Sequence, residues 1–563
     1  MNYLKTLCGI FAGLALSLTT ALQAQLPEVR SVNDKWLLHV HDEPMLILGG
    51  QVMNSSTFDV EWMDSVWPRV KALNLNTLIL PISWQAVEEV EGQFDFSLID
   101  EAIRQARAHD MKIVLAWFGT WKNGRSFFPP EYVMRDLERF PRMESAEGQR
   151  LEVLSFYGEH TLAADRRAFV AMIEHLKAVD GEENTVVMVQ IQNEVGLLGD
   201  SRDRSPAAEA AFNGPVPAEL MAYLVANKDR LKPHLRELWA AQNWREAGTW
   251  TEVFGDSIST DEIFMAWHYA RFIDQMAEAA ADVYGIPYYA NAWLGQVPNP
   301  VPGQIPSGGP VARMMDVWKA GAPHLALLAP DIYAMFSERT ADFSRDDNPL
   351  LVPEAVPLWL GDLNSGGPQA FYTFGEAHGF GYGPFAIDHS LYTADHPIGV
   401  AYGALDNLSH LIIEHIGTPN MRAFFREGDE TEHTLEIGPY QFSITYQSRL
   451  EQCYGIIIRT GENEFVLAGN GARVFVTPAD RETHSGLSIT FVEEGHFDDD
   501  DQFVRQRIVG GDEVVGTVGL KLPAHGYDLE HSLTNMTILR ARFFLHPPRR
   551  RGAAQGIDET PEF

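Results

Sequence analysis

Eight short apolar runs recur along the chain up to residue 387, and most are separated by a segment with helical periodicity. The runs lack polar alternation, which is typical of strands buried on both faces. Segments such as 97–110 and 166–179 repeat apolar residues at helical spacing. The candidate strands are 44–50, 77–83, 112–118, 185–192, 287–293, 325–333, 349–355 and 379–387. Strands that alternate with helices in this way form a parallel sheet.

Eight such units predict an α/β fold of the (β/α)8 TIM-barrel type over residues 25–425. A doubly wound sheet is the competing architecture, but no Gly-rich phosphate loop follows the first run. The link between the fourth and fifth runs is long and predicts a helical insertion at about 200–285. Insertions at the C-terminal face of a barrel usually shape the substrate cleft.

The pattern changes beyond residue 425. Short alternating runs separated by Gly, Asn and Asp predict a β-sandwich-like domain over 426–546. The last residues, 547–563, are rich in Pro, Gly and Arg, and we expect a disordered tail.

The first 24 residues have the composition of a secretory signal peptide. Lys5 precedes an apolar run that ends in the small-residue sequence Leu22-Gln23-Ala24. Removal of 1–24 would leave Cys453 as the only cysteine and no intramolecular disulfide. We therefore expect an exported protein, periplasmic or extracellular, with no membrane anchor after cleavage.

The chain carries 43 basic and 77 acidic residues, for a net charge of −34. This balance argues against a nucleic-acid partner, because phosphate binding needs a basic face. No His, Asp and Glu residues have the spacing of a metal site, so neither a metal nor another cofactor is expected. A neutral substrate is compatible with an acidic surface.

Two acids fall at predicted strand ends, where a barrel places its active site. Glu194 lies near the end of the sequence "VMVQIQNEVG" (187–196), after the fourth strand, and Glu354 follows the seventh. A strand-terminal Glu is often only part of a structural ion pair, but two of them facing one cleft are the arrangement for glycoside hydrolysis. Tyr333, after the sixth strand, is expected to donate a hydrogen bond to Glu354. Glu376 is a second-ranked candidate for the nucleophile.

Aromatic residues supply the other half of a candidate sugar site. The tryptophans at or just beyond strand ends are Trp84, Trp117, Trp121 and Trp293. Such rings stack on the apolar faces of pyranoses, so we expect them to bind substrate. The alternative is that they fill the mouth of the barrel as core residues.

The motifs resemble those of glycoside hydrolase family 35, the retaining β-galactosidases. Residues 84–96, "WQAVEEVEGQFDF", are similar to the family's W-N-x-H-E-P-x-x-G-x-F-D-F, and "QIQNEVG" to its Q-x-E-N-E-Y-G. The resemblance implies that Glu194 is the acid/base, Asn193 its substrate-binding neighbour, and Glu354 the nucleophile. The stretch from Gly49 to Asn54 replaces the family's S-G-x-x-H-Y, and Asn54 is expected to contact substrate there.

The resulting expectation is a retaining, exo-acting β-galactosidase that removes terminal β-D-galactosyl residues from plant-type glycans. The appended β domain is similar to that of a bacterial subgroup resembling xyloglucan side-chain β-galactosidases. Two alternatives stay open at this level. One is another retaining β-glycosidase of the same clan, such as a β-glucosidase, β-mannosidase or endo-β-1,4-glycanase. The other is a secreted carbohydrate-binding protein with an inactive barrel.

Overall fold

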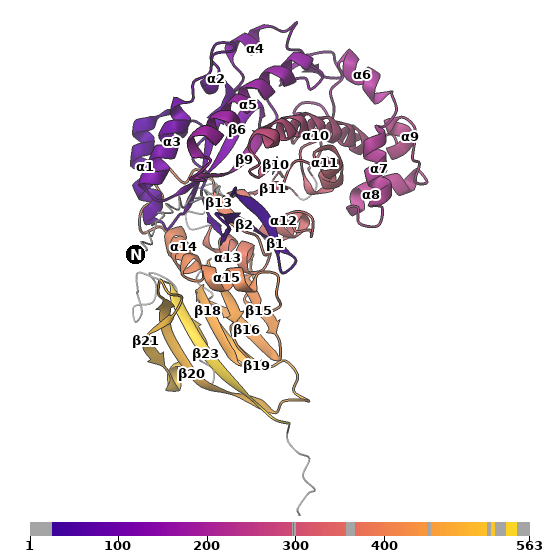
Figure 1. The fold of residues 1–563 in the computed structure, drawn as a ribbon. Helices are drawn as coiled ribbons and strands as arrows, with labels where there is room; N and C mark the ends of the chain where they lie inside the picture. The colour runs from indigo at the N-terminus through magenta and orange to yellow at the C-terminus, as the bar shows by residue number, and fades with distance from the viewer. Residues whose placement is uncertain are drawn as a thin grey trace, which may run out of the picture.

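The computed structural model describes residues 25–295, 297, 300–355, 366–447, 452–514, 519–523 and 536–548. The predicted signal peptide, 1–24, and residues 549–563 of the predicted tail lie outside these ranges. Figure 1 shows a barrel of strands and helices above a pair of β-sheets, with helices between the two parts.

Eight parallel strands form the barrel, as the sequence predicts. In chain order they are β4 (Ile47–Leu48), β5 (Thr77–Ser83), β6 (Lys112–Lys122), β9 (Val186–Asn193), β10 (Tyr288–Trp293), β11 (Leu327–Ile332), β12 (Leu351–Ala355) and β13 (Gly381–Pro384). Their order in the sheet is β4-β13-β12-β11-β10-β9-β6-β5. A single bridge from Gln51, just after β4, to Ile79 of β5 joins the two ends of this order and nearly closes the barrel.

The first barrel strand is shorter than the predicted run 44–50. Residues Glu43–Met45 form β3, which pairs antiparallel with β2 (Lys35–Val40), and β2 in turn pairs with β1 (Glu28–Val32). This small sheet, which the sequence analysis missed, lies at the N-terminal ends of the barrel strands. Its loop residue His41 contacts the Glu183 carbonyl just before β9 through its Nε2.

A helix packs outside the barrel after each strand. These helices are α1 (Val60–Ala72), α3 (Ser97–Ala108), α5 (Glu159–Asp180), α10 (Ile258–Val283), α11 (Met315–Gly321), α12 (Phe336–Phe343), α13 (Gly367–Gly375) and α14 (Pro397–Asn407). Their starts follow capping rules: the Asp59 carboxylate accepts the Trp62 N–H at α1, and Ser257 accepts from Thr260 at α10. Within the described ranges, each helix is too short or too polar to cross a membrane.

Other helices lie in the connections. The short helices α2 (Trp84–Val87) and α4 (Glu131–Arg135) precede α3 and α5, and a hairpin of β7 (Arg142–Glu144) and β8 (Arg150–Leu154) follows α4. The insertion after β9 holds α6 (Pro206–Phe212), α7 (Ala218–Ala226), α8 (Pro233–Ala241) and α9 (Trp250–Phe254), grouped at one side of the barrel in Figure 1. Pro233 opens α8, so the periodic stretch 217–242 forms two helices rather than one.

The C-terminal part contains two antiparallel sheets. One has the strand order β14 (Met421–Phe425), β17 (Tyr454–Arg459), β18 (Glu464–Asn470), β23 (Thr537–His546), β20 (Gly486–Phe497) and β21 (Phe503–Val509). The other joins β15 (Glu432–Ile437), β16 (Tyr440–Tyr446), β19 (Ala472–Pro478) and β22 (Leu520–Leu522). Because β14 pairs with β17, this part begins before residue 426, where the sequence analysis placed the boundary.

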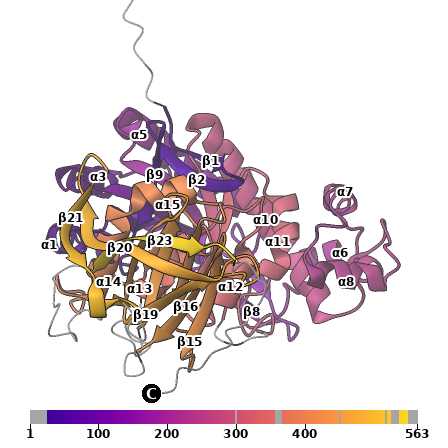
Figure 2. The ribbon, with the colours of Figure 1, turned by 90° about the horizontal axis from the view of Figure 1, so that it is seen from below.

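The six-stranded sheet uses both of its faces. Residues such as Leu467 and Phe543 pack toward the smaller sheet in a core of their own. Ile456 and Val466 belong instead to the core of the barrel. Helices α13 and α14, together with α15 (Ser409–His415), lie between barrel and sheet in the views of Figures 1 and 2. The barrel core is therefore continuous with the C-terminal sheet.

Close packing at this junction requires Gly375 at the end of α13. A Cβ at this position would lie 2.7 Å from the Ala423 Cβ and 2.9 Å from the Ile456 Cδ1. We expect Gly375→Val to lower the free energy of unfolding by about 1–3 kcal/mol through overpacking, as measured by urea unfolding. Gly461, where a Cβ would meet only Glu464 at 3.5 Å, is the matched control. Equal stability of the two valine variants would contradict a tightly packed junction.

Candidate active site

Three carboxyl groups meet at the C-terminal ends of the barrel strands. Glu194 directly follows β9, Asp331 lies near the end of β11, and Glu354 lies in β12, in register with Asp331. Their exposed fractions are 3%, 0% and 6%. The sequence predicted Glu194 and Glu354 at these strand ends and did not single out Asp331. Buried acids this close together are stable only when hydrogen-bond donors or cations surround them.

The backbone that carries Glu194 is left-handed at two non-glycine residues. The φ angle is 63° at Gln192 and 47° at Glu194. Conformations of this kind cost about 1–3 kcal/mol and persist only where the surroundings enforce them. Here the Glu194 N–H donates to the Asn291 Oδ1 at 2.9 Å, and its carbonyl accepts the Gly124 N–H at 3.1 Å. Neighbouring strand ends thus hold the acid in place.

Gln192 has a structural part that its sequence position did not reveal. Its Nε2 donates to Asp165 at 2.6 Å, and its Oε1 accepts the Trp121 N–H at 3.0 Å. Asp165 is buried in α5 and also accepts the indole N–H of Trp117 at 2.8 Å and the Thr120 N–H at 3.0 Å. One carboxylate therefore ties the ends of β6 and β9 to a helix.

Glu354 accepts hydrogen bonds from two side chains on different strands. The Gln51 Nε2 donates to its Oε2 at 2.9 Å, and the Tyr333 hydroxyl donates to its Oε1. The predicted contact between Tyr333 and Glu354 is thus present. Burial, with the carboxylates around it, raises the pKa of Tyr333 well above its usual value, so the hydroxyl stays a donor.

Amide side chains connect the acids. The Asn193 Oδ1 accepts from the Gln190 Nε2 at 2.9 Å and from the Asn291 Nδ2 at 3.2 Å. The same Asn291 Nδ2 donates to the Asp331 Oδ2 at 2.7 Å. The Asn193 Nδ2 donates to Asn123 at 3.2 Å. The predicted substrate-binding residue Asn193 is therefore fully buried within this network.

The pKa values of the three acids are higher than those of ordinary surface carboxylates. Burial raises the pKa of Glu194 to about 8, and the negative charge of Glu354 adds to the increase. Burial also raises the pKa of Glu354, opposed by the Lys122 ammonium and by hydrogen bonds from Tyr333 and Gln51. For Asp331, burial and then Glu354 and Glu194 hold the pKa well above its usual range. Glu194 can therefore carry a proton near neutral pH.

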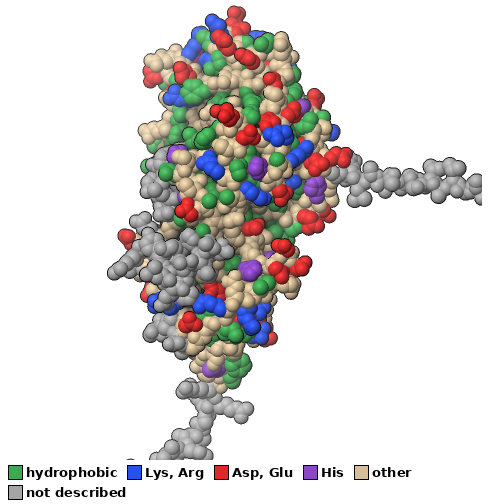
Figure 3. Space-filling view, turned by 90° about the vertical axis from the view of Figure 1, so that its left-hand side faces the viewer, with side chains coloured by type: hydrophobic (Ala, Val, Ile, Leu, Met, Phe, Trp, Pro, Cys, Tyr) green, Lys and Arg blue, Asp and Glu red, His purple; other side chains and the backbone are tan. Residues whose placement is uncertain are grey.

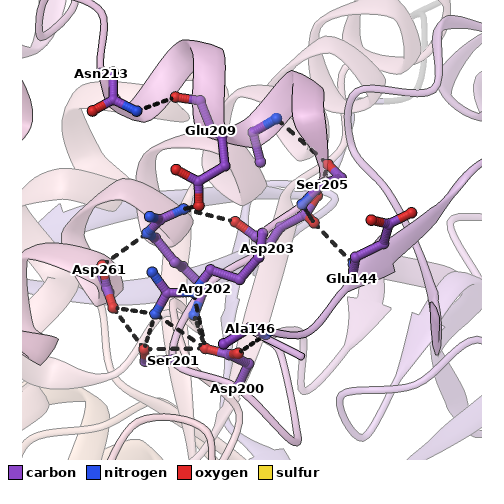
Figure 4. A network of polar contacts seen from close by, with 12 residues as sticks. Glu144, Ala146, Asp200, Ser201, Arg202, Asp203, Ser205, Glu209, Asn213 and Asp261 are labelled. Atoms are coloured by element: carbon purple, nitrogen blue, oxygen red, sulfur yellow. Dashed lines mark hydrogen bonds and ion pairs between the residues drawn. The ribbon is translucent and has the colours of Figure 1, made fainter. Parts of the chain in front are cut away.

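The loop after Glu194 is held by a polar network (Figure 4). Arg204 contacts Asp200 at 3.2 Å and Asp261 of α10 at 2.9 Å, and Arg202 contacts Asp261 at 3.0 Å. Asp203 accepts the Glu144 N–H at 3.0 Å and so joins the loop to the β7–β8 hairpin. The loop that borders the site is consequently fixed to two other elements.

Three of the four predicted sugar-stacking tryptophans are core residues. Trp84, Trp117 and Trp121 are fully buried. Trp84 donates to Glu88 at 2.8 Å, Trp117 to Asp165, and Trp121 to the Leu154 carbonyl at 2.9 Å. Their rings have no free face for a sugar, so the prediction was wrong for them. Trp293 is half-buried and lies in register with Asp331.

Two further candidates are not joined to the acids by any described contact. Asn54 is half-buried in the turn after Gln51, and its Oδ1 has no partner among the described residues. Glu376, the second-ranked nucleophile, caps α13 and pairs with Arg422 of β14 at 2.7 Å. It belongs to the junction with the C-terminal sheet rather than to the barrel mouth.

The site contains four polar residues that the sequence analysis did not select: Gln51, Lys122, Asn291 and Asp331. Each lies in the last three residues of a barrel strand or just beyond its C-terminal end. The same rule that selected Glu194 applies to them, and polar residues closing buried runs are the pattern that could have found them.

Among the described residues, no cluster of three or more His, Cys, Asp or Glu side chains could hold a metal ion. On the face of the molecule drawn in Figure 3, acidic side chains are spread between basic ones, in keeping with the net charge of −34. The reactive groups that the site offers are thus carboxyls, amides, one ammonium and one phenol.

Two family models match parts of the chain. A glycoside hydrolase family 42 model described as "Beta-galactosidase" matches residues 56–278, and DUF5597, a domain of unknown function, matches 398–519. The first match supports a glycoside hydrolase of the β-galactosidase type. It points to family 42, so the resemblance to family 35 stays a prediction. No curated protein matches the chain.

Solved structures with a similar fold are distant in sequence. The β-galactosidase of the psychrophilic Marinomonas ef1 is 11% identical, with 66% of this chain and 61% of that chain covered and a TM-score of 0.43. The catalytic domain of β-amylase from Paenibacillus polymyxa is 13% identical, with 65% and 98% covered and a TM-score of 0.41. A β-1,4-D-mannanase from Cryptopygus antarcticus is 12% identical, with 64% and 88% covered and a TM-score of 0.38. This chain thus spans about three fifths of the Marinomonas enzyme.

The pKa of Glu194 predicts how a neutral replacement changes stability with pH. In the unfolded chain this carboxyl ionises near pH 4.5, whereas in the folded protein it keeps its proton up to about pH 8. The wild type therefore loses stability relative to Glu194→Gln as pH rises between these values. We expect Glu194→Gln to melt at a higher temperature than wild type at pH 8 and to differ less at pH 5.

The control is Glu246→Gln, which alters an exposed carboxylate. Its melting temperature should track that of the wild type at both pH values. A Glu194→Gln advantage of the same size at pH 5 and pH 8 would contradict a protonated Glu194.

Proposed function

We propose that the protein is a retaining β-galactosidase with Glu194 as the acid/base and Glu354 as the nucleophile. The observation that carries this proposal is the pair of buried carboxyls at the ends of β9 and β12, placed in unlike surroundings. Glu354 receives two hydrogen bonds that favour its ionised form, while Glu194 holds a proton to about pH 8. Two acids with separated tasks are what glycoside hydrolysis needs.

In the first step, a Glu354 oxygen attacks the anomeric carbon and forms a covalent glycosyl ester. The bond between that carbon and the aglycone oxygen breaks, and the Glu194 proton passes to the leaving oxygen. The Tyr333 and Gln51 donors orient the Glu354 carboxylate for this attack. Lys122, which lowers the pKa of both acids, offsets the excess negative charge.

In the second step, the ionised Glu194 takes a proton from water as the water oxygen attacks the same carbon. The ester bond to Glu354 breaks and the sugar leaves with its original anomeric configuration. Glu194 is thereby protonated again for the next turnover.

The sugar and its source are the finer part of the proposal. The family 42 model supports galactose, and the motif resemblance to family 35 favours terminal β-D-galactosyl residues of plant-type glycans, such as xyloglucan side chains. We also propose that residues 1–24 direct export, to the periplasm or beyond. The second candidate, a clan-related glycosidase for another sugar, is favoured by the changed motifs after the first and third strands.

The two acids should respond differently to replacement. Glu354→Ala should lower kcat for 4-nitrophenyl β-galactoside on the order of 10³-fold or more, since no covalent intermediate forms. Glu194→Ala should lose about 10²–10⁴-fold with a poor leaving group and much less with 2,4-dinitrophenolate, which needs no protonation. Glu376→Gln serves as the matched control and should stay near wild type. Loss of less than tenfold in Glu354→Ala would contradict its assignment.

A panel of aryl glycosides tests the sugar. We expect the β-galactoside to be hydrolysed with a kcat/KM at least about tenfold above those of the β-glucoside and β-mannoside, with the β-anomer as the first product by NMR. A faster glucoside or mannoside would establish the clan alternative, and binding without hydrolysis would establish an inactive barrel. Galactosylated xyloglucan oligosaccharides compared with lactose then test the natural glycan.

A further inference from the structure

Asp331 supplies a third carboxyl that the two steps above do not use. It is fully buried on β11, and its Oδ2 accepts the Asn291 Nδ2 at 2.7 Å. Its Oδ1 is also buried and receives no donor N–H or O–H from the described residues. A hydrogen bond between the side chains of Asp331 and Glu194 raises the pKa of Asp331 and lowers that of Glu194. The Oδ1 of Asp331 is thus left without a donor, while the proposed acid/base interacts with the same carboxyl.

Ionisation of both of two buried carboxyls in contact is strongly disfavoured, because like charges at this distance repel. A hydrogen bond between them exists only when one of them carries a proton. Asn291 satisfies one oxygen of Asp331 and leaves the other for this shared proton. The same Asn291 holds the Glu194 N–H through its Oδ1, so one amide sets the spacing of the pair.

We infer that Asp331 is a positioning residue for Glu194, with which it shares one proton. The inference rests on the proposed function, in which Glu194 is the acid/base. When that proton passes to the leaving oxygen, two anionic carboxyls remain side by side. Their repulsion makes Glu194 a stronger base, which then removes a proton from water and restores the shared proton.

The other charged or titratable groups around the pair come from neighbouring strands. Glu354 of β12 adds a negative charge, Lys122 of β6 adds a positive one, and Tyr333 and Tyr289 present phenols whose pKa values Glu354 and Asp331 raise further. Because these groups are unchanged in an Asp331 variant, a shift in the titration of Glu194 reports on Asp331.

The test is Asp331→Asn, which keeps the shape but cannot share a proton. The alkaline limb of the pH profile of kcat/KM reports loss of the last proton of the pair. It should move to lower pH by at least about one unit, because loss of that proton no longer leaves two adjacent charges. With a substrate for which hydrolysis of the glycosyl ester limits turnover, kcat and KM should fall together, because Glu194 is a weaker base in this variant. Asp180→Asn, a buried carboxyl before the start of β9, should leave the limb in place. An unshifted limb in Asp331→Asn would overturn the inference.

A measurement without turnover separates this inference from the proposed function. In ¹³C NMR of protein labelled at Asp carboxyls, one resonance should titrate far above the usual range in wild type and at lower pH in Glu194→Gln. Identical Asp titrations in the two proteins would overturn the shared proton, also where Asp331→Asn does not fold. A wild type that hydrolyses no glycoside but shows the coupled titration would refute the function alone.

Discussion

The burial of three carboxyls in one hollow is the constraint on which the rest of the site depends. Glu194, Asp331 and Glu354 are nearly inaccessible, and desolvation raises the pKa of each. Such a group is stable only where donors, a cation or a shared proton compensate for the lost water. The amides, the phenol and the ammonium at the strand ends supply this compensation, and they place the carboxyls in unlike surroundings.

The position of Glu194, the proposed acid/base, depends on residues outside the hollow. Asp165 of α5 binds Gln192 and the end of β6, and this holds two left-handed residues that the backbone alone would avoid. The three polar residues near the end of "VMVQIQNEVG" thus have different roles. Gln192 faces the helix and fixes the turn, Asn193 joins the amide network, and Glu194 meets the other acids. Through this strained turn, the contact between Gln192 and α5 fixes the orientation of Glu194.

The sequence predicts the barrel well because buried strands and amphipathic helices have local signatures. Strand β5 coincides with its predicted range, and both acids lie at strand ends as expected. The predictions that failed concern the directions of side chains, which no local sequence pattern encodes. Trp117, within β6, directs its indole N–H to Asp165 of α5. Asp331 also lies near the end of a buried run, so its position could have been predicted. Its contacts with side chains from other strands exist only after folding and could not.

The C-terminal sheets are better understood as support for the side of the barrel that carries Glu354, the proposed nucleophile, than as an independent module. Helix α13 is the next described element after β12, the strand that carries Glu354, and it packs on β14 and β17. Gly375, Glu376 and Tyr372 of this region all contact the sheet, through close packing, the Arg422 ion pair and Phe425. Because the core of the barrel continues into that sheet, the two parts should unfold together. A glycan-binding module would not need to share its core with the catalytic barrel.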